Sequence, residues 1–303
     1  MPKVNTVTLS SAFDAREVTL PDFDKQYLDD VSFVTAMTLV MMGNYCQTGH
    51  FGGPLAYTPY TVASHLIGPE LGGLKYDYRR PKHPYSDKFM LAGGHNAPVT
   101  YALWMVLGEA LYQKHKNTGD RKYLADYSQT LLPIDCIGFR RSKEGMKTIL
   151  EQTGLTDHPA MAQAQLRGIR ALSGHSESTD ATNDVNGGPS GIGIATAAGK
   201  ATFWDIIGAS ESPKIMAVEG EFAMTSGHSQ EMKTQAVAQQ VGKRLRVLMS
   251  YNNAGIDDEL IGGVIQPQYE SYRIVDQWTS YGWNVFSVDD ANDMGQVVAA
   301  FKA

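Results

Sequence analysis

Residues 214–222 read KIMAVEGEF, and residues 244–257, beyond a helical stretch at 229–242, read RLRVLMSYNNAGID. Each apolar run ends in polar side chains, with carboxylates after the first run and amides after the second. Strands that alternate with helices in this order are typical of a parallel α/β sheet. Because such sheets bind ligands outside the carboxyl ends of their strands, the stretch predicts both a fold class and the place of a site.

The alternation extends outward from this stretch in both directions and predicts a parallel sheet flanked by helices. Helices are expected at 25–47, 59–68, 96–115, 191–208, 272–282 and 293–303, and further strands at 87–94 and 283–288. Residues 1–24 are expected to form an irregular N-terminal arm, and residues 120–172 to be mainly helical.

Glycine-framed segments accompany these elements. They are TGHFGGP (48–54), GGHNAP (93–98), SGHSES (173–178) and NGGPSGIG (186–193). Three of them place a histidine directly after a glycine, namely His50, His95 and His175. Glycine allows the backbone to approach a ligand closely, and imidazole transfers protons near neutral pH. One such histidine alone is more simply explained as a turn residue bonded to nearby backbone, whereas three in this register favour a functional site.

Composition argues against several classes of protein. The chain has 303 residues, 43% hydrophobic content and a formal net charge of −6, without a cluster of Lys and Arg. This argues against a nucleic-acid partner, and no apolar run is long enough to span a membrane. The N-terminus lacks the apolar segment of a secretory signal, and Cys46 and Cys136 lie far apart without a motif. A cytoplasmic protein with reduced thiols is the simplest interpretation.

The polar residues after the two apolar runs indicate a cation site. Carboxylate and amide oxygens suit Mg²⁺, which commonly bridges phosphate groups. Ordinary polar strand ends would look the same, so the pair alone leaves both interpretations open. Together with the glycine–histidine segments, it predicts a site for a diphosphate-bearing cofactor.

The whole chain resembles the N-terminal, diphosphate-binding domain of the transketolase family of thiamine-diphosphate enzymes. TGHFGGP resembles the family's Gly-His-Pro-Gly-x-Pro segment, and residues 89–108 resemble its Phe-Val-Leu-Ser-Asn-Gly-His segment and the helix that follows. SGHSE (173–177) resembles Gly-His-Pro-Glu, residues 187–201 resemble the Gly-Pro-Leu-Gly-Gln-Gly helix start, and SYGWNV (280–285) resembles Tyr-Gly-Trp-x-Val. The resemblance implies a thiamine-diphosphate-binding α/β fold, with residues 25–303 as the diphosphate-binding domain.

The resemblance also implies a role for each residue that matches a family motif. His50 would lie near the thiazolium ring and the substrate, and His95 would contact the cofactor diphosphate. His175 would contact the substrate carbonyl or hydroxyl. All three are expected to be catalytic, and the first two to bind the cofactor as well. Further cofactor-binding residues would be Gly188, Gly220, Glu221 and Asn252.

The metal motif departs from the family's Gly-Asp-Gly, a tripeptide that this chain lacks. Either of two glutamates can be aligned with the family's aspartate. Glu219 is preferred because the apolar strand residues then run directly into the motif, whereas Glu221 better preserves the spacing to Gly227. Asn252 matches the family's metal asparagine, with Asn253 as the fallback, and the backbone carbonyl of Ala254 would be a further ligand. The expected cation is Mg²⁺, with Ca²⁺ or Mn²⁺ as alternatives, because glutamate is longer than aspartate and Mg²⁺ demands near-ideal geometry.

Two differences in length also separate the chain from the family. Residues 117–172 exceed the family's usual connection and are expected to be a helical insertion, either at a substrate entrance or inert on the surface. The family's pyrimidine-binding domain, which supplies the glutamate that activates the cofactor, has no counterpart here. The chain is therefore expected to be a fragment, or one subunit of a split enzyme, that holds part of the active site.

The implied reaction is transfer of a two-carbon ketol unit from a ketose or ketose phosphate to an aldose or aldose phosphate, with thiamine diphosphate and Mg²⁺. The expected partners are these sugars, a pyrimidine-binding domain or subunit, and a second copy in a homodimer. Other thiamine-diphosphate reactions stay open, such as those of a 2-oxoacid dehydrogenase E1 component or a deoxyxylulose-phosphate synthase. A catalytically silent homologue that acts as a scaffold is the third alternative.

Overall fold

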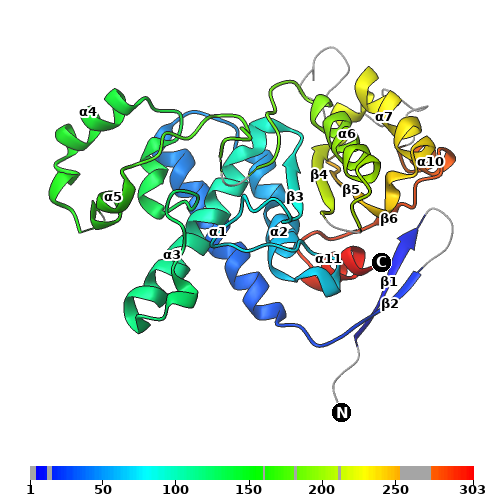
Figure 1. The fold of residues 1–303 in the computed structure, drawn as a ribbon, viewed down its shortest axis with the longest axis horizontal. Coiled ribbons are helices and arrows are strands. Elements are labelled where there is room, and N and C mark those ends of the chain that lie inside the picture. Colours follow the sequence, from blue (N-terminus) through cyan, green and yellow to red (C-terminus); the bar gives the residue numbers. More distant parts are fainter. Residues whose placement is uncertain (1–4, 12–15, 160, 181–182, 211–212, 253–273) are drawn as a thin grey trace.

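A parallel sheet with helices around it carries the predicted site (Figure 1). The computed structural model describes residues 5–11, 16–159, 161–180, 183–210, 213–252 and 274–303. The sheet has the order β3-β4-β5, formed by β3 (Lys88–Leu91), β4 (Ile215–Gly220) and β5 (Leu245–Ser250). Leu91 pairs with Val218 and Gly220 with Ser250, so the carboxyl ends of the strands share one edge. The predicted α/β class and parallel sheet are confirmed.

Alternate side chains of this sheet belong to two apolar cores, one on each face. Phe89 and Leu91 are buried in the core that contains α2 and α3, whereas Met90 is buried in the core that contains α6 and α7. Successive side chains of a strand point to opposite faces, so one continuous apolar run supplies both cores. The flanking helices are α2 (Gly52–Leu66), α3 (Ala97–Thr118), α6 (Ile192–Ile206) and α7 (Gly227–Ala238).

Helix α1 (Lys25–Cys46) packs against α2 and α3 and leads directly into the site. Asp24 caps its start by accepting a hydrogen bond from the Tyr27 N–H at 2.9 Å, and Gln47 ends it in the left-handed conformation. The connection to α2 is short and contains His50. The remaining helices near the C-terminus are α10 (Ile274–Ser280) and α11 (Met294–Lys302).

The sequence analysis expected an irregular N-terminal arm, and this is wrong: the arm contains two paired strands. β1 (Asn5–Ser11) and β2 (Arg16–Leu20) are antiparallel, and β6 (Phe286–Ser287) extends this second sheet by pairing with β1. The strand expected at 283–288 is therefore only two residues long and lies beside the N-terminal strands. Leu9, Val18 and Leu20 are buried in the same core as α1, which ties the arm to the rest of the chain.

The described residues of the stretch 120–172 are less helical than expected. They contain α4 (Lys143–Thr153), α5 (Met161–Arg167) and three 3₁₀ turns (Arg121–Tyr123, Pro133–Gly138 and Leu155–Asp157). The buried carboxylate of Asp135 organises the stretch, because it accepts hydrogen bonds from Arg167 Nη1 at 3.0 Å and from the backbone N–H of Arg170 at 2.9 Å. Such a buried ion pair adds little net stability, because the cost of removing both charges from water offsets their attraction.

The other predicted helices are confirmed within a few residues at each end. The helix expected at 59–68 is the exception, because it begins earlier, at Gly52, with Pro54 in its first turn, where proline is well tolerated. Within the described ranges, no helix combines the length and apolarity that crossing a bilayer requires.

Candidate functional site

Three of the glycine-framed segments are hydrogen-bonded to one another just beyond the end of β3. The Ser176 N–H donates to the Gly94 carbonyl at 2.9 Å, and the Gly187 N–H donates to the Ser176 carbonyl at 2.9 Å. The Ser176 hydroxyl donates to the carbonyl of Leu91, the last residue of β3, at 3.2 Å. A side chain at Gly94 would overlap the carbonyl of Gly187, so glycine is required for this close approach. Segments that are far apart in sequence thus form one cradle.

The three predicted histidines lie around this cradle. The rings of His50 and His95 meet edge to face, with centroids 5.3 Å apart. Burial lowers the pKa of His95, and the imidazoles of His50 and His175 lower it further, so both of these rings lie near His95. His50 and His175 are exposed and His95 is half-buried. Among the described residues, no backbone group is hydrogen-bonded to any of these rings, so an ordinary turn role does not account for them.

Asn96 is a site residue that the sequence analysis missed. Its Nδ2 lies 3.3 Å from Nε2 of His95, and its Oδ1 is buried without a hydrogen-bond partner among the described residues. A side chain at Gly53, in the first turn of α2, would overlap this oxygen. Asn96 therefore connects the fourth glycine-framed segment, 48–54, to the cradle. A buried amide oxygen is normally hydrogen-bonded to protein or to ordered water, so this oxygen can accept a hydrogen bond from a bound group.

Glu219, the preferred metal carboxylate, lies in β4 with both oxygens bonded to backbone. Oε2 accepts from the Gly191 N–H at 3.1 Å, and Oε1 accepts from the Gly220 N–H at 3.0 Å. The side chain is buried, and burial raises its pKa, partly offset by these two N–H donors. Glu219 therefore ties the start of α6 to the end of β4.

Glu221 and Asn252 lie together where β4 and β5 end. The Asn252 N–H donates to Oε1 of Glu221 at 2.8 Å, and the Glu221 N–H donates to the Ser250 carbonyl at 3.1 Å. Glu221 is buried and Asn252 is exposed. The predicted ligand Ala254 and the fallback Asn253 lie outside the described residues. In the ranges that the structure describes, no group of three His, Cys, Asp or Glu residues is arranged to hold a metal.

Gly188 leaves the backbone open just before α6. A side chain there would meet nothing within 4 Å, and the residue is exposed. Gly191 then turns the chain into the helix with a φ of 88°. Open backbone near the N-terminus of a helix can receive an anionic group. Gly220, the last residue of β4, is half-buried beside Tyr57, another residue that the sequence analysis missed.

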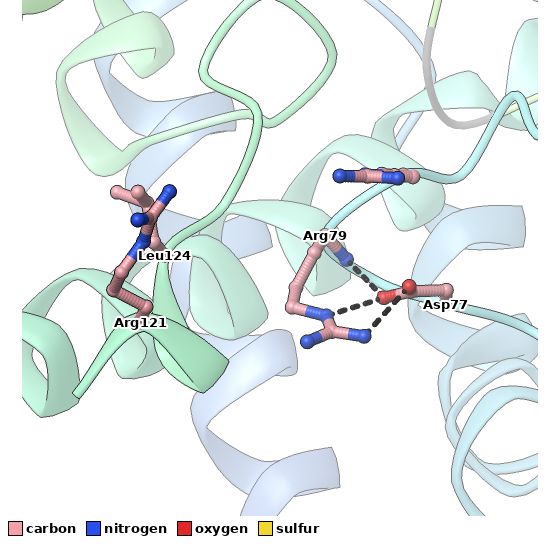
Figure 2. Close-up of a pocket in the computed structure, with 5 residues that line it drawn as sticks. Asp77, Arg79, Arg121 and Leu124 are labelled. Carbon is pink, nitrogen blue, oxygen red and sulfur yellow. Dashed lines mark hydrogen bonds and ion pairs between the residues drawn. The ribbon is translucent and has the colours of Figure 1, made fainter.

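A surface cavity of about 250 Å³ lies elsewhere (Figure 2). Its lining residues are Asp77, Arg79, Arg80, Arg121 and Leu124. Arg79 is bonded to Asp77 through Nε at 2.8 Å, while Arg121 approaches from the opposite side (Figure 2). Arg121 follows the C-terminal end of α3, a helix of 22 residues, and His95 precedes its N-terminal end, so roughly 33 Å of helix separates Arg121 from His95. The cavity does not belong to the histidine site.

Comparisons with known proteins agree with this arrangement. The family model described as transketolase, thiamine diphosphate binding domain, matches residues 148–303. Transketolase 1 of Candida albicans is 25% identical over 283 residues, which are 90% of this chain and 33% of that protein. Transketolase-like protein 2 of Mus musculus is 30% identical over 94 residues, which are 31% of this chain and 14% of that protein.

Solved structures with the same fold are also transketolases. The Campylobacter jejuni enzyme matches with a TM-score of 0.64 at 18% identity, over 92% of this chain and 36% of that chain. The Leishmania mexicana enzyme matches with a TM-score of 0.62 at 18% identity, over 91% of this chain and 34% of that chain. The chain thus spans about a third of the length of these structures. Since the family model covers slightly more than half of the sequence, the chain belongs to the transketolase family and contains its thiamine diphosphate binding domain.

Proposed function

We propose that the chain binds thiamine diphosphate with a divalent cation and takes part in transfer of a two-carbon ketol unit between sugars or sugar phosphates. The observation that carries this proposal is the convergence of the glycine-framed segments on three histidines, beside a carboxylate and an amide at neighbouring strand ends. Bound thiamine diphosphate would supply the carbon nucleophile that attacks a ketose carbonyl. The rest of the reaction depends on how the protein positions substrates and moves protons.

The donor set at the ends of β4 and β5 fits a hard cation. The Glu221 carboxylate and the Asn252 amide would hold Mg²⁺, with Ca²⁺ or Mn²⁺ as alternatives, and the carbonyl of Ala254 would add a ligand. The geometry favours Glu221 over Glu219, because Glu221 lies next to Asn252, whereas both oxygens of Glu219 are bonded to backbone. Three protein ligands would leave positions on a six-coordinate Mg²⁺ for phosphate oxygens.

The diphosphate would lie over the open backbone of Gly188 and beside Gly220, with His95 in contact. The lowered pKa of His95 keeps its imidazole neutral near pH 7, so one nitrogen can accept a proton and the other can donate one. His50 and His175, which are more exposed, would bind and orient the carbonyl and hydroxyl groups of the sugar. Asn96 would orient the ring of His95 through Nδ2.

The complete enzyme would need a pyrimidine-binding domain or subunit and a second copy of the chain. Seven large apolar side chains of α1 are exposed, which is more than isolated surface residues explain. They are Tyr27, Phe33, Val34, Met37, Val40, Met41 and Tyr45. This α1 face supports a homodimer, in which a second copy would cover it.

Product analysis of the complete protein tests the reaction. With thiamine diphosphate, Mg²⁺, a ketose phosphate and an aldose phosphate, we expect an acceptor lengthened by two carbons and a donor shortened by two. Release of carbon dioxide from pyruvate without sugar products would indicate a decarboxylating enzyme instead. Cofactor binding without either reaction would indicate a catalytically silent homologue.

A further inference from the structure

The surface cavity of about 250 Å³ is lined by arginines from two segments of the chain. Arg79 and Arg80 belong to the loop before β3, and Arg121 belongs to the 3₁₀ turn that follows α3. Figure 2 shows Arg121 on one side of the cavity and Arg79, bonded to Asp77, on the other. Because these segments are far apart in the sequence, only the fold brings their positive charges together.

Hydrogen bonds of Arg79 tie the two walls of the cavity to each other. Its Nη1 donates to the Lys122 carbonyl at 3.1 Å, and its own carbonyl accepts from the Asp126 N–H at 3.1 Å. Its Nε and Nη2 donate to the two carboxylate oxygens of Asp77 at 2.8 and 2.9 Å. The charge of Arg79 is therefore balanced by Asp77, and the protein itself fixes the shape of the cavity, as is usual for ligand sites.

The other two arginines of the cavity have no such counter-charge. Arg80 and Arg121 are exposed, and in the described part of the chain no acceptor is hydrogen-bonded to either guanidinium. Side-chain hydrogen bonds from Ser128 and Gln129, at 2.6 and 2.8 Å, occupy the two carboxylate oxygens of Asp126. They lower the pKa of Asp126, and the neighbouring Arg80 lowers it further. Two free guanidinium groups thus line one cavity of a chain whose formal net charge is −6.

We infer that this cavity binds a small polyphosphate anion between Arg80 and Arg121, at a site separate from that of the cofactor. A guanidinium presents a planar set of donors that matches phosphate oxygens in pairs, and it stays charged at every physiological pH. Guanidinium groups from two walls suit an anion with more than one charged group. The cavity has the volume of roughly eight water molecules, which admits a small ion. The inference does not rest on the proposed function, because Arg121 and His95 lie beyond opposite ends of α3.

Calorimetric titration of the 303-residue chain with inorganic triphosphate, and separately with inorganic phosphate, tests the inference. The buffer contains EDTA, so that the proposed metal-dependent cofactor site does not contribute. The variants are Arg80→Gln and Arg121→Gln, each of which removes one exposed positive charge from the cavity. The matched control is Arg140→Gln, at an exposed arginine outside the cavity that lies beside Gly174, near the histidine site. A further titration with adenosine triphosphate compares a free triphosphate with that of a nucleotide.

We expect the wild type to bind one triphosphate per chain, at least about tenfold more tightly than inorganic phosphate, and each cavity variant to lose about tenfold in affinity. Arg140→Gln should match the wild type, and all three variants should keep its melting temperature, because the exchanged side chains are exposed. Tighter binding of adenosine triphosphate would assign the site to a nucleotide, and weaker binding to a free polyphosphate.

Three results would overturn the inference. The wild type would fail to bind triphosphate, or the cavity variants would bind it as the wild type does, which would place the anion elsewhere. An equal loss of affinity in Arg140→Gln would indicate a general effect of charge instead of a site in the cavity.

Discussion

His65 of α2 shows what burial does to a single titratable group. It is fully buried among Tyr76, Phe89 and Trp104, its Nδ1 lies 2.8 Å from the Thr61 carbonyl, and its Nε2 has no partner among the described residues. Burial lowers its pKa to about 4. The neutral ring is therefore part of the core, and protonation would place an unpaired charge there.

This burial makes the free energy of unfolding depend on pH. His65 takes up a proton near pH 6.5 in the unfolded state but only near pH 4 in the folded state. The stabilising contribution of the neutral ring is therefore complete above pH 6.5 and is lost as pH falls toward 4. We expect a loss of about 3 kcal/mol over this window. Urea unfolding of the wild type and of His65→Gln at several pH values measures it. The variant should be less stable at pH 7 but should lose less stability on acidification, and parallel curves would contradict the assignment.

Glu219 and Glu221 are predicted to have different roles despite their proximity. Glu219→Gln replaces an acceptor by an NH₂ group that faces the N–H of Gly191 or Gly220, so we expect a loss of roughly 1–3 kcal/mol in unfolding free energy. Glu221→Gln keeps an oxygen for the Asn252 N–H and should change stability less, but it should weaken Mg²⁺-dependent cofactor binding by at least about tenfold. The opposite pattern would restore Glu219 as the metal ligand.

Residue types and spacing were enough to single out the three histidines as candidate site residues. They did not show which glutamate faces Asn252. The glycine–histidine register is a local pattern, so His50, His95 and His175 can be recognised without a structure. The apolar pattern of β4 favoured Glu219 as the metal carboxylate. It could not show that both Glu219 oxygens are bonded to backbone, one of them to a glycine 28 positions away. Asn96 carries no motif, because a buried oxygen without a partner arises only from the tertiary structure.

At the scale of elements, the cradle depends on glycines at which chain segments meet. Gly94→Ala would push a methyl group into the Gly187 carbonyl and separate the end of β3 from the segment before α6. We expect a loss of about 1–3 kcal/mol in unfolding free energy. Gly188→Ala is the matched control in the same cradle, because its methyl group would meet nothing within 4 Å and should cost less than about 0.5 kcal/mol. Equal losses in urea unfolding would contradict this account.

The main helices and central strands could be predicted from the sequence, whereas the N-terminal strands could not. Long apolar-periodic helices and the buried runs of β4 and β5 carry strong local signals. β1 and β2 are short and largely polar, although Val7 and Leu9 alternate with threonines, as do Leu20 and Val18 around Thr19. β6 has only two residues and depends on pairing with β1, a contact nearly three hundred residues away in the chain that no local pattern encodes.

For the whole molecule, the α1 face predicts self-association. Phe33 and Met41 are each 66% exposed, and burial of such side chains is worth about 1.5–3 kcal/mol each. Sedimentation velocity should show a dimer for the wild type and a monomer for Phe33→Glu combined with Met41→Glu. Tyr85→Glu, at a side chain that is 65% exposed but outside α1, should remain dimeric. Unchanged sedimentation of the double variant would exclude this face as the interface.

Binding of thiamine diphosphate through a divalent cation, at the converging segments, is the property on which the other assignments depend. Calorimetric titration of the chain with thiamine diphosphate, first with Mg²⁺ and then with EDTA, tests it most directly. We expect one site per chain, with binding that EDTA abolishes and Mg²⁺ restores. Binding that is indifferent to EDTA, or no binding even with a pyrimidine-binding domain or subunit present, would contradict this assignment.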